Sequence, residues 1–338
     1  IVGPAKQVVA AIAPFSPQSL DAMGSANSRG DAIIVGCVAY AENIGTIWEG
    51  MRQYFNVAGV PFDFVMFTTY DRQIEALMQG SIDIAWNGPL AHVRLKRRTG
   101  GRSVSLGMRD CDRDFSSVLV VRKNSPIKSL KDLRGKRLAT GSFDSPQSYL
   151  LPLHAVETAA GAEVLKTVHV VRFDRDLGKH GDTAAGELEV MDALNRGEVD
   201  AGFVSEVMWN KGNATGRVNG RGQPKLEALR GLVPPFDHCQ FDALPSLSAA
   251  KRDAFTKTLF AMTMADDFQR RIMQDEGIRE KWEGPREEGY TAMHAVLANE
   301  PAEPFRGPLD TVASHRFASL DVRVLDGYGA TTFARACT

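Results

Sequence analysis

The chain has 338 residues, of which 43% are hydrophobic and 24% are charged, a composition and length that fit two ordinary globular domains. A formal net charge of -1 supplies no basic field, which argues against nucleic acid and anionic membrane surfaces as partners. The sequence has no apolar run of the roughly 20 residues that a spanning helix needs, so we expect no membrane insertion.

The first 30 residues precede the regular pattern. They do not begin with Met, and they lack the charged start and long apolar stretch of an intact signal peptide. We expect either a processed, exported chain or a trimmed one, with residues 1–30 as an N-terminal extension.

Strands and helices alternate in the next part of the chain. The sequence predicts strands at 31–40, 62–67 and 82–86 and helices at 43–55, 70–80 and 89–98. This alternation is typical of a mostly parallel sheet with helices on both faces. Ligands of such sheets bind at the carboxyl ends of the strands. Tyr40, Trp86 and Asn87 lie at predicted strand ends and are therefore candidate ligand-binding residues.

A second alternating series follows, with a strand, turn, short helix and strand over 116–140 and further elements to residue 205. Two series joined by long strands predict two lobes. Lobe 1 comprises residues 31–120 and 240–338, and lobe 2 comprises residues 121–239.

The four cysteines, Cys37, Cys111, Cys239 and Cys337, are far apart in the sequence and form no CxxC motif. This spacing argues against a structural zinc site and against a dense disulfide framework. The even number still permits disulfides.

The segment GSFDSPQSYLLP predicts a helix start in which Ser145 is the N-cap and Pro146 takes the first helical position. Free N–H groups and the positive end of such a helix favour an oxyanion. Ser145, Gln147 and Ser148 are candidate ligands, and the alternative is an ordinary capped helix.

The segment DLGKHGDTAAGE at 176–187 follows a strand and carries polar side chains, including His180, Asp182 and Glu187, between glycines that allow the backbone to bend closely. Its alternative is a solvated turn. The polar side chains of this segment, together with His238 and Cys239, would suggest a metal site. Their spacing matches no strong metal motif, so we predict neither a metal nor a cofactor.

Four segments, IWEGMRQYF, ALMQGSIDIAWNGPLAHVR, LKDLRGKRLATGSFDSPQSYLLP and GEVDAGFV, resemble in order and spacing the periplasmic phosphate, phosphite and phosphonate solute-binding proteins. The resemblance runs from about residue 31 to about residue 300. It implies a two-lobed α/β periplasmic binding protein of type II, with mixed, mostly parallel sheets flanked by helices and the ligand between the lobes. It also implies that His180 and Glu187 contact the ligand and that the protein is not an enzyme.

The chain departs from the family at two places. Phosphonate-binding members have a Ser-Thr-Ser-Gly loop where this chain has Ser145-Pro146-Gln147-Ser148, and proline offers no N–H. In the run MRDCDRD, Cys111 stands where the family pattern has an oxygen side chain.

Cys37 is a second cysteine in the expected ligand region, and thiolates select soft partners. The combination resembles the arsenite-sensing branch, whose members report arsenite to a membrane sensor histidine kinase. We therefore expect Cys111 to contact arsenite, with a Cys37–Cys111 disulfide and bland packing as alternatives.

Two further functions stay open. The chain would otherwise be the phosphonate, phosphite or phosphate component of an ABC transporter, with a permease as its partner. From a different class, a metal-dependent hydrolase would use His180, Asp182, His238 and Cys239. The sequence contains no nucleophile elbow, HExxH or P-loop to support an enzyme.

Overall fold

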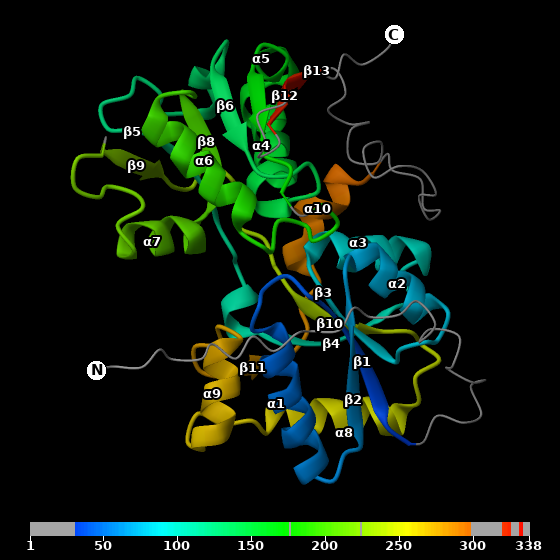
Figure 1. The fold of residues 1–338 in the computed structure, drawn as a ribbon. Helices are drawn as coiled ribbons and strands as arrows, with labels where there is room; N and C mark the ends of the chain where they lie inside the picture. The colour runs from blue at the N-terminus through cyan, green and yellow to red at the C-terminus, as the bar shows by residue number, and fades with distance from the viewer. Residues whose placement is uncertain (1–30, 176, 224, 299–319, 326–330, 334–338) are drawn as a thin grey trace, which may run out of the picture. The chain divides into compact units, whose positions relative to one another are not determined.

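A computed structural model describes residues 31–298 apart from 176 and 224, together with 320–325 and 331–333. The expected extension at 1–30 and Cys337 lie outside the described residues. From Ile33 onward the described chain forms two β-sheets, each flanked by helices (Figure 1). We call each sheet with its helices the first lobe and the second lobe.

The sheet of the first lobe has the strand order β11-β4-β10-β3-β1-β2 within the described residues. Its strands are β1 (Ile33–Val38), β2 (Phe62–Phe67), β3 (Ile84–Asn87), β4 (Val104–Arg109), β10 (Gln240–Ala243) and β11 (Trp282–Glu283). β1 pairs in parallel with β2 and β3, whereas β10 runs antiparallel to β3 and β4. β1 is buried on both faces, which explains its nearly continuous apolar sequence.

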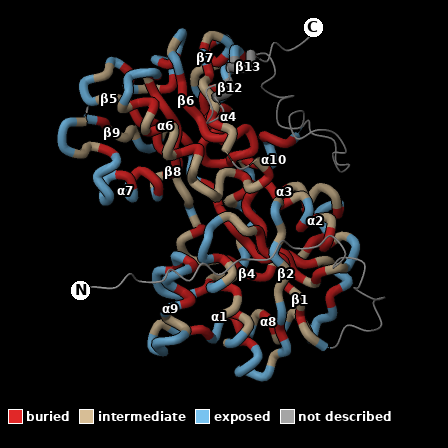
Figure 2. Tube along the Cα trace, viewed as in Figure 1, coloured by how far each residue is buried: buried red, intermediate tan, exposed pale blue. Residues whose placement is uncertain are grey.

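Helices cover this sheet, and their apolar faces fill its core. They are α1 (Ile44–Val57), α2 (Tyr70–Met78), α3 (Pro89–Arg98), α8 (Ala249–Phe260) and α9 (Asp267–Asp275). Trp48 and Phe55 of α1 pack with Phe255 of α8 and Phe241 of β10. Figure 2 shows the buried residues concentrated along the strands and the helix sides that face them.

The sheet of the second lobe has the strand order β13-β12-β7-β6-β8-β5-β9. Its strands are β5 (Ser117–Arg122), β6 (Arg137–Thr140), β7 (His169–Arg172), β8 (Ala201–Ser205), β9 (Leu226–Leu229), β12 (Asp321–Leu325) and β13 (Thr331–Phe333). β6 is parallel to β7 and β8, and β5 is antiparallel to β8 and β9. The predicted fold class, two mixed sheets flanked by helices, is confirmed. The expectation that the sheets are mostly parallel is wrong, because antiparallel pairs of the described strands are at least as frequent as parallel ones.

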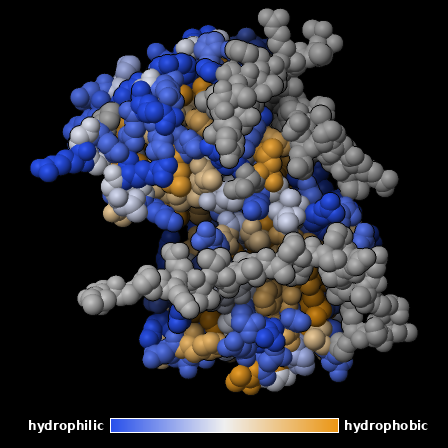
Figure 3. Space-filling view, in the orientation of Figure 1, coloured by the Kyte–Doolittle hydropathy of each residue, from blue (hydrophilic) through white to orange (hydrophobic). Residues whose placement is uncertain are grey.

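The remaining helices are a π-helical turn (Pro146–Leu150) that continues into α4 (Leu151–Ala160), α5 (Ala162–Leu165), α6 (Ala185–Arg196), α7 (Glu206–Ala214) and α10 (Thr291–Val296), with short 3-10 turns at Asp110–Asp112, Leu130–Leu133 and Glu288–Tyr290. None of the helices in the described residues combines the length and apolar content needed to cross a membrane. On the face drawn in Figure 3, hydrophilic residues predominate on the part of the second lobe that grey atoms do not cover.

The C-terminal part differs from the predicted division, which placed all of 240–338 in lobe 1. Strand β12 pairs in parallel with β7, so residues 321–325 belong to the second sheet. This pairing covers an edge of β7 that would otherwise be open. Met293 of α10 also joins a core cluster that contains residues of α4. Residues 117–120, predicted in lobe 1, also lie in the second sheet as part of β5. The division of the remaining residues stays a prediction.

Candidate functional site

Among the described residues, two segments that run from one lobe to the other lie side by side: residues 110–116 between β4 and β5, and residues 230–239 between β9 and β10. We call them the crossing pair. Phe115 and Phe236 exchange two backbone hydrogen bonds of 2.6 and 3.0 Å, and the His238 N–H donates to the Asp112 carbonyl over 2.8 Å. The pairing therefore places Asp112 beside His238, although the two residues are 126 positions apart in the sequence (238 minus 112).

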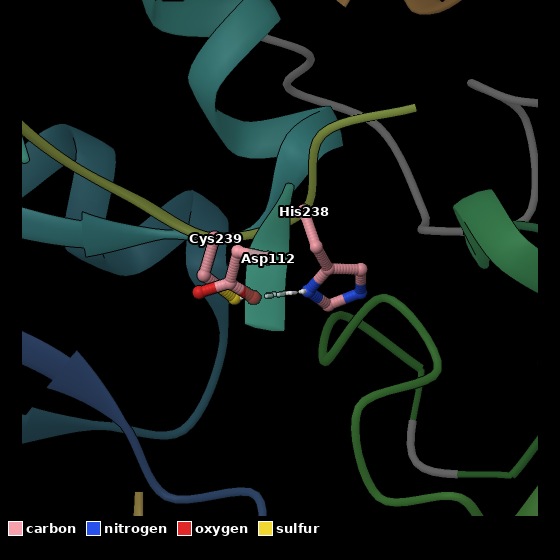
Figure 4. A group of neighbouring side chains, drawn as sticks. All are labelled: Asp112, His238 and Cys239. Carbon is pink, nitrogen blue, oxygen red and sulfur yellow. Dashed lines mark hydrogen bonds and ion pairs between the residues drawn. The ribbon is translucent and has the colours of Figure 1, made fainter. Parts of the chain in front are cut away.

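Asp112, His238 and Cys239 form what we call the crossing cluster (Figure 4). His238 Nδ1 lies 3.1 Å from Cys239 Sγ and 3.7 Å from Asp112 Oδ1, and all three side chains are buried. Burial lowers the pKa of His238 to about 4 and raises the pKa of the Cys239 thiol well above its usual range. At neutral pH the imidazole is therefore uncharged and the thiol keeps its proton.

Arg109 ties the cluster to the first lobe. Its Nε and Nη2 donate to the two oxygens of the Asp112 carboxylate over 2.6 and 2.8 Å. Its Nη1 donates to the Glu276 carboxylate over 3.1 Å and to the Glu276 carbonyl over 2.6 Å. The guanidinium also lies 5.2 Å from the centre of the Trp86 ring. This arrangement joins the end of β4, the turn after it and the end of α9.

The loop at 177–184 comes from the second lobe and contacts the first. The Tyr70 N–H donates to the Gly178 carbonyl over 2.9 Å, and the Tyr70 hydroxyl donates to the Asp182 carboxylate. The His180 ring stacks on Tyr70 with 4.6 Å between centroids and 15° between planes. Asp182 Oδ1 lies 3.6 Å from His238 Nε2, so this loop reaches the crossing cluster.

The predicted helix start is present beside this loop. Ser145 caps the turn, accepting from the Ser148 N–H over 3.3 Å, and the Ser148 hydroxyl donates to Ser145 Oγ over 2.8 Å. Both serines are fully buried, and the Gln147 carbonyl accepts from the Ser117 hydroxyl. A Cβ built on Gly181 would lie 2.4 Å from Ser145 Oγ, so the loop runs directly against the helix start.

Glu187 lies in the first turn of α6 and is buried. It accepts from the Ser205 N–H and, over 2.7 Å, from the Ser205 hydroxyl. Burial raises the pKa of Glu187 to about 6 and that of Asp182 to about 7, and lowers the pKa of His180 well below its usual range. Near neutral pH Glu187 is therefore mostly ionised and Asp182 is partly ionised, whereas the imidazole of His180 is uncharged.

Some predicted site residues serve the first-lobe core instead. Trp86 packs on Phe241 with 4.4 Å between ring centroids. Asn87 is buried, its Oδ1 accepting from Gln73 and its Nδ2 donating to Asp242, each over 2.9 Å. Tyr40 follows β1 and packs partly buried against the same core. Their roles as ligand contacts stay predictions.

The described cysteines are all free, so the alternative of a Cys37–Cys111 disulfide is wrong. Cys37 is buried in β1, with its Sγ 3.7 Å from the Val65 carbonyl of the neighbouring strand. Cys111 is half-buried and lies at Gly277, where an added Cβ would be 3.9 Å from its Sγ. The two thiols thus occupy different surroundings.

Sequence analysis missed Asp112, Arg109, Tyr70, Glu276 and Ser205. Asp112 and Arg109 stand in the run MRDCDRD, whose several charged residues give no sign of which of them pair in the folded protein. The predicted hydrolase set is assembled only in part: Asp182, His238 and Cys239 come together, and Asp112 rather than His180 completes the group of potential metal-ligating side chains.

The architecture, two mixed sheets flanked by helices, is that of a type II periplasmic binding protein. A family model described as "ABC transporter, phosphonate, periplasmic substrate-binding protein" matches residues 39–290. The chain belongs to this family of substrate-binding proteins.

Individual relatives are distant. A probable ABC transporter phosphite binding protein PhnD1 of Prochlorococcus marinus (strain MIT 9301) is 24% identical over 63% of this chain and 68% of its own length. The phosphonates-binding periplasmic protein of Escherichia coli (strain K12) is 26% identical over 45% of this chain and 48% of its own length.

Solved structures share the fold at lower identity. The structure of PhnD1 from Prochlorococcus marinus in complex with methylphosphonate has a TM-score of 0.57 and 17% identity, covering 79% of this chain and 97% of that one. A binding protein component of an ABC phosphonate transporter from Pseudomonas aeruginosa has a TM-score of 0.54 and 18% identity, covering 86% of this chain and 96% of that one.

Proposed function

We propose that the chain is the solute-binding component of an ABC transporter for a small phosphorus oxyanion of the phosphonate, phosphite or phosphate class. It acts in the periplasm, delivers its ligand to a membrane permease and performs no chemistry on it. The observation that carries the proposal is the helix start at Ser145 and Ser148, with two buried hydroxyls at the positive end of a helix and the 177–184 loop against it.

The physical basis is the supply of buried neutral donors at the helix start. Helix N–H groups and serine hydroxyls stabilise negative charge where they are shielded from water. His180, whose Nδ1 has no hydrogen-bond partner among the described residues, adds a neutral polar group beside them. The relatives named for phosphite and phosphonate binding support the same ligand class.

The test is calorimetric titration of the purified chain with phosphite, methylphosphonate and phosphate. We expect one of these to bind, and we expect Ser148→Ala to weaken it about tenfold, because a buried hydrogen-bond donor is lost. Thr158→Ala is the matched control: its hydroxyl lies in the same helix and donates to the His154 carbonyl. Failure of all three anions to bind, or equal losses in both variants, would contradict the proposal.

A second candidate is arsenite binding with signalling to a membrane sensor histidine kinase. The observation that favours it is Cys111, which is half-buried, whereas Cys37 and Cys239 are buried, so its thiol is the most accessible of the three described thiols. Titration with arsenite, repeated on Cys111→Ser, separates the two functions. The arsenite function would replace the transport proposal if the unmodified chain bound arsenite but no phosphorus oxyanion, and if Cys111→Ser no longer bound arsenite.

A further inference from the structure

We propose that the crossing cluster is a binding site for a divalent cation of the zinc class, with Asp112, His238 Nδ1 and Cys239 Sγ as ligands. Nothing in the family assignment calls for a cation, and the sequence alone predicts none. The ligands of this site are other residues than Ser145 and Ser148, and the 177–184 loop contacts both groups, through Gly181 at Ser145 and through Asp182 at His238.

The geometry suits a small borderline-soft ion. One oxygen, one nitrogen and one sulfur atom, all potential ligands, lie within 4.8 Å of one another, and the two separations from His238 Nδ1 are 3.1 and 3.7 Å. Ligand atoms about 2.0 to 2.3 Å from a tetrahedral zinc ion are themselves about 3 to 4 Å apart. Figure 4 shows the three side chains directed toward one another from the two segments of the crossing pair.

The other ring nitrogen of His238 supports this assignment. His238 is 6% exposed, and its Nε2 has no hydrogen-bond partner among the described residues but lies 3.6 Å from Asp182 Oδ1. A histidine that binds a metal through one nitrogen usually directs the other toward a carboxylate, which fixes the tautomer and the ring orientation. Asp182 is in position for that role, and the Tyr70 hydroxyl holds Asp182.

The charges around the cluster also favour a cation. Arg109 is paired with both Asp112 and Glu276, so two carboxylates face one guanidinium. When a cation binds, the Cys239 sulfur loses its proton to solvent and coordinates as a thiolate. Two carboxylates and one thiolate then face one guanidinium, so the group has a formal charge of -2. A divalent ion neutralises this charge.

The test uses the purified full chain, stripped with EDTA and kept reduced by a phosphine. We expect stoichiometric Zn²⁺ binding with release of a proton, seen as a dependence of the binding heat on the buffer. Co²⁺ should give an intense near-ultraviolet sulfur-to-metal band. The band should disappear in Cys239→Ser and remain in Cys111→Ser, the matched control whose thiol lies outside the cluster.

Asp182→Asn should bind Zn²⁺ about tenfold more weakly or worse, as expected for a residue that orients a ligating histidine. His238→Gln, read out by Zn²⁺ affinity, is the second ligand variant if circular dichroism shows that Cys239→Ser does not fold. Substoichiometric zinc in the unmodified chain, a cobalt band that survives Cys239→Ser, or unchanged zinc affinity in His238→Gln would each overturn the proposal.

Discussion

The two sides of the 177–184 loop differ in how their buried polar groups are satisfied. On the first-lobe side, Arg109, Asp112 and Glu276 form ion pairs with one another. On the second-lobe side, Ser145 and Ser148 pair through neutral hydroxyls at a helix start. The same loop contacts both, through Asp182 at His238 and through Gly181 at Ser145.

This difference indicates where an anion can bind. A guanidinium already held by two carboxylates has little charge left for a third anion, and the carboxylates repel one. Hydroxyls and helix N–H groups carry only partial charges, so a buried anion gains stabilisation there without displacing a counter-ion. This difference supports the proposals that an oxyanion binds on the second-lobe side and a cation on the first-lobe side.

The largest expected effect is that of Arg109→Ala, because it leaves Asp112 and Glu276 buried without their cation. Removing one partner of a buried ion pair typically costs about 3 to 5 kcal/mol, and we expect a loss of unfolding free energy in this range. Urea denaturation measures it. Arg109→Lys keeps the charge but not the paired donors, so its loss should be smaller. A loss in Arg109→Ala below about 1 kcal/mol would mean that the first-lobe side is not held by ion pairs.

The next effect is on the second-lobe side, at Gly181. Its φ of +77° lies in the left-handed region, and an added Cβ would meet Ser145 Oγ at 2.4 Å. Gly135 is the matched control, because its φ is +66° but its Cβ would meet no described atom within 4 Å. We expect Gly135→Ala to cost about 1 kcal/mol and Gly181→Ala about 2 to 3 kcal/mol, with weaker oxyanion binding only in the latter. Equal costs by denaturation would show that the loop does not pack tightly on the helix start.

The fold was predictable because its signals are local. Alternating apolar strands and amphipathic helices, such as those of β1 and α1, depend on neighbours in the sequence, and so does the capped start at Ser145. The prediction that residues 321–325 belong to lobe 1 is wrong, because the partner of an edge strand depends on which sheet edge is open. The sequence of the segment itself does not indicate that edge.

The candidate site was predictable only in part. Ser145, His180 and Glu187 stand in segments with a local signal, a helix start and a glycine-flanked loop. Asp112 joins His238 and Cys239 only because Phe115 and Phe236 pair across the crossing segments. Trp86 and Asn87 were chosen for their position at a strand end, but their side chains are buried in first-lobe packing and hydrogen bonds. The direction in which a side chain points, and the residues that it contacts, depend on tertiary contacts that cannot be predicted from a single sequence.

A further prediction concerns the pH dependence of stability on the second-lobe side. Burial raises the pKa of Glu187 in the folded protein from 4.5 to about 6, so the folded state favours the protonated carboxyl. Its contribution is present below the unfolded pKa and is lost as the pH rises through the folded value. A difference of about 1.5 pKa units corresponds to about 2 kcal/mol.

We expect this loss between about pH 4.5 and 6. It is measured as the difference in unfolding free energy between the unmodified chain and Glu187→Gln across that range, since the other buried carboxyls titrate in both. Glutamine keeps an acceptor for the two Ser205 donors and does not ionise. A difference that stays constant with pH would mean that Glu187 titrates as in the unfolded chain.

The smallest expected effect distinguishes the two thiols on the first-lobe side. Cys111 is half-buried beside Gly277, and Cys239 is 3% exposed with its Sγ 3.1 Å from His238 Nδ1. Replacing sulfur by the smaller, more polar hydroxyl should change the unfolding free energy by less than about 0.5 kcal/mol at Cys111 and by about 1 to 2 kcal/mol at Cys239. Thermal and urea denaturation of the two metal-free serine variants measure both. If Cys111→Ser cost as much as Cys239→Ser, the half-buried thiol would be part of the packed network, and its exposure would no longer favour contact with a soft ligand.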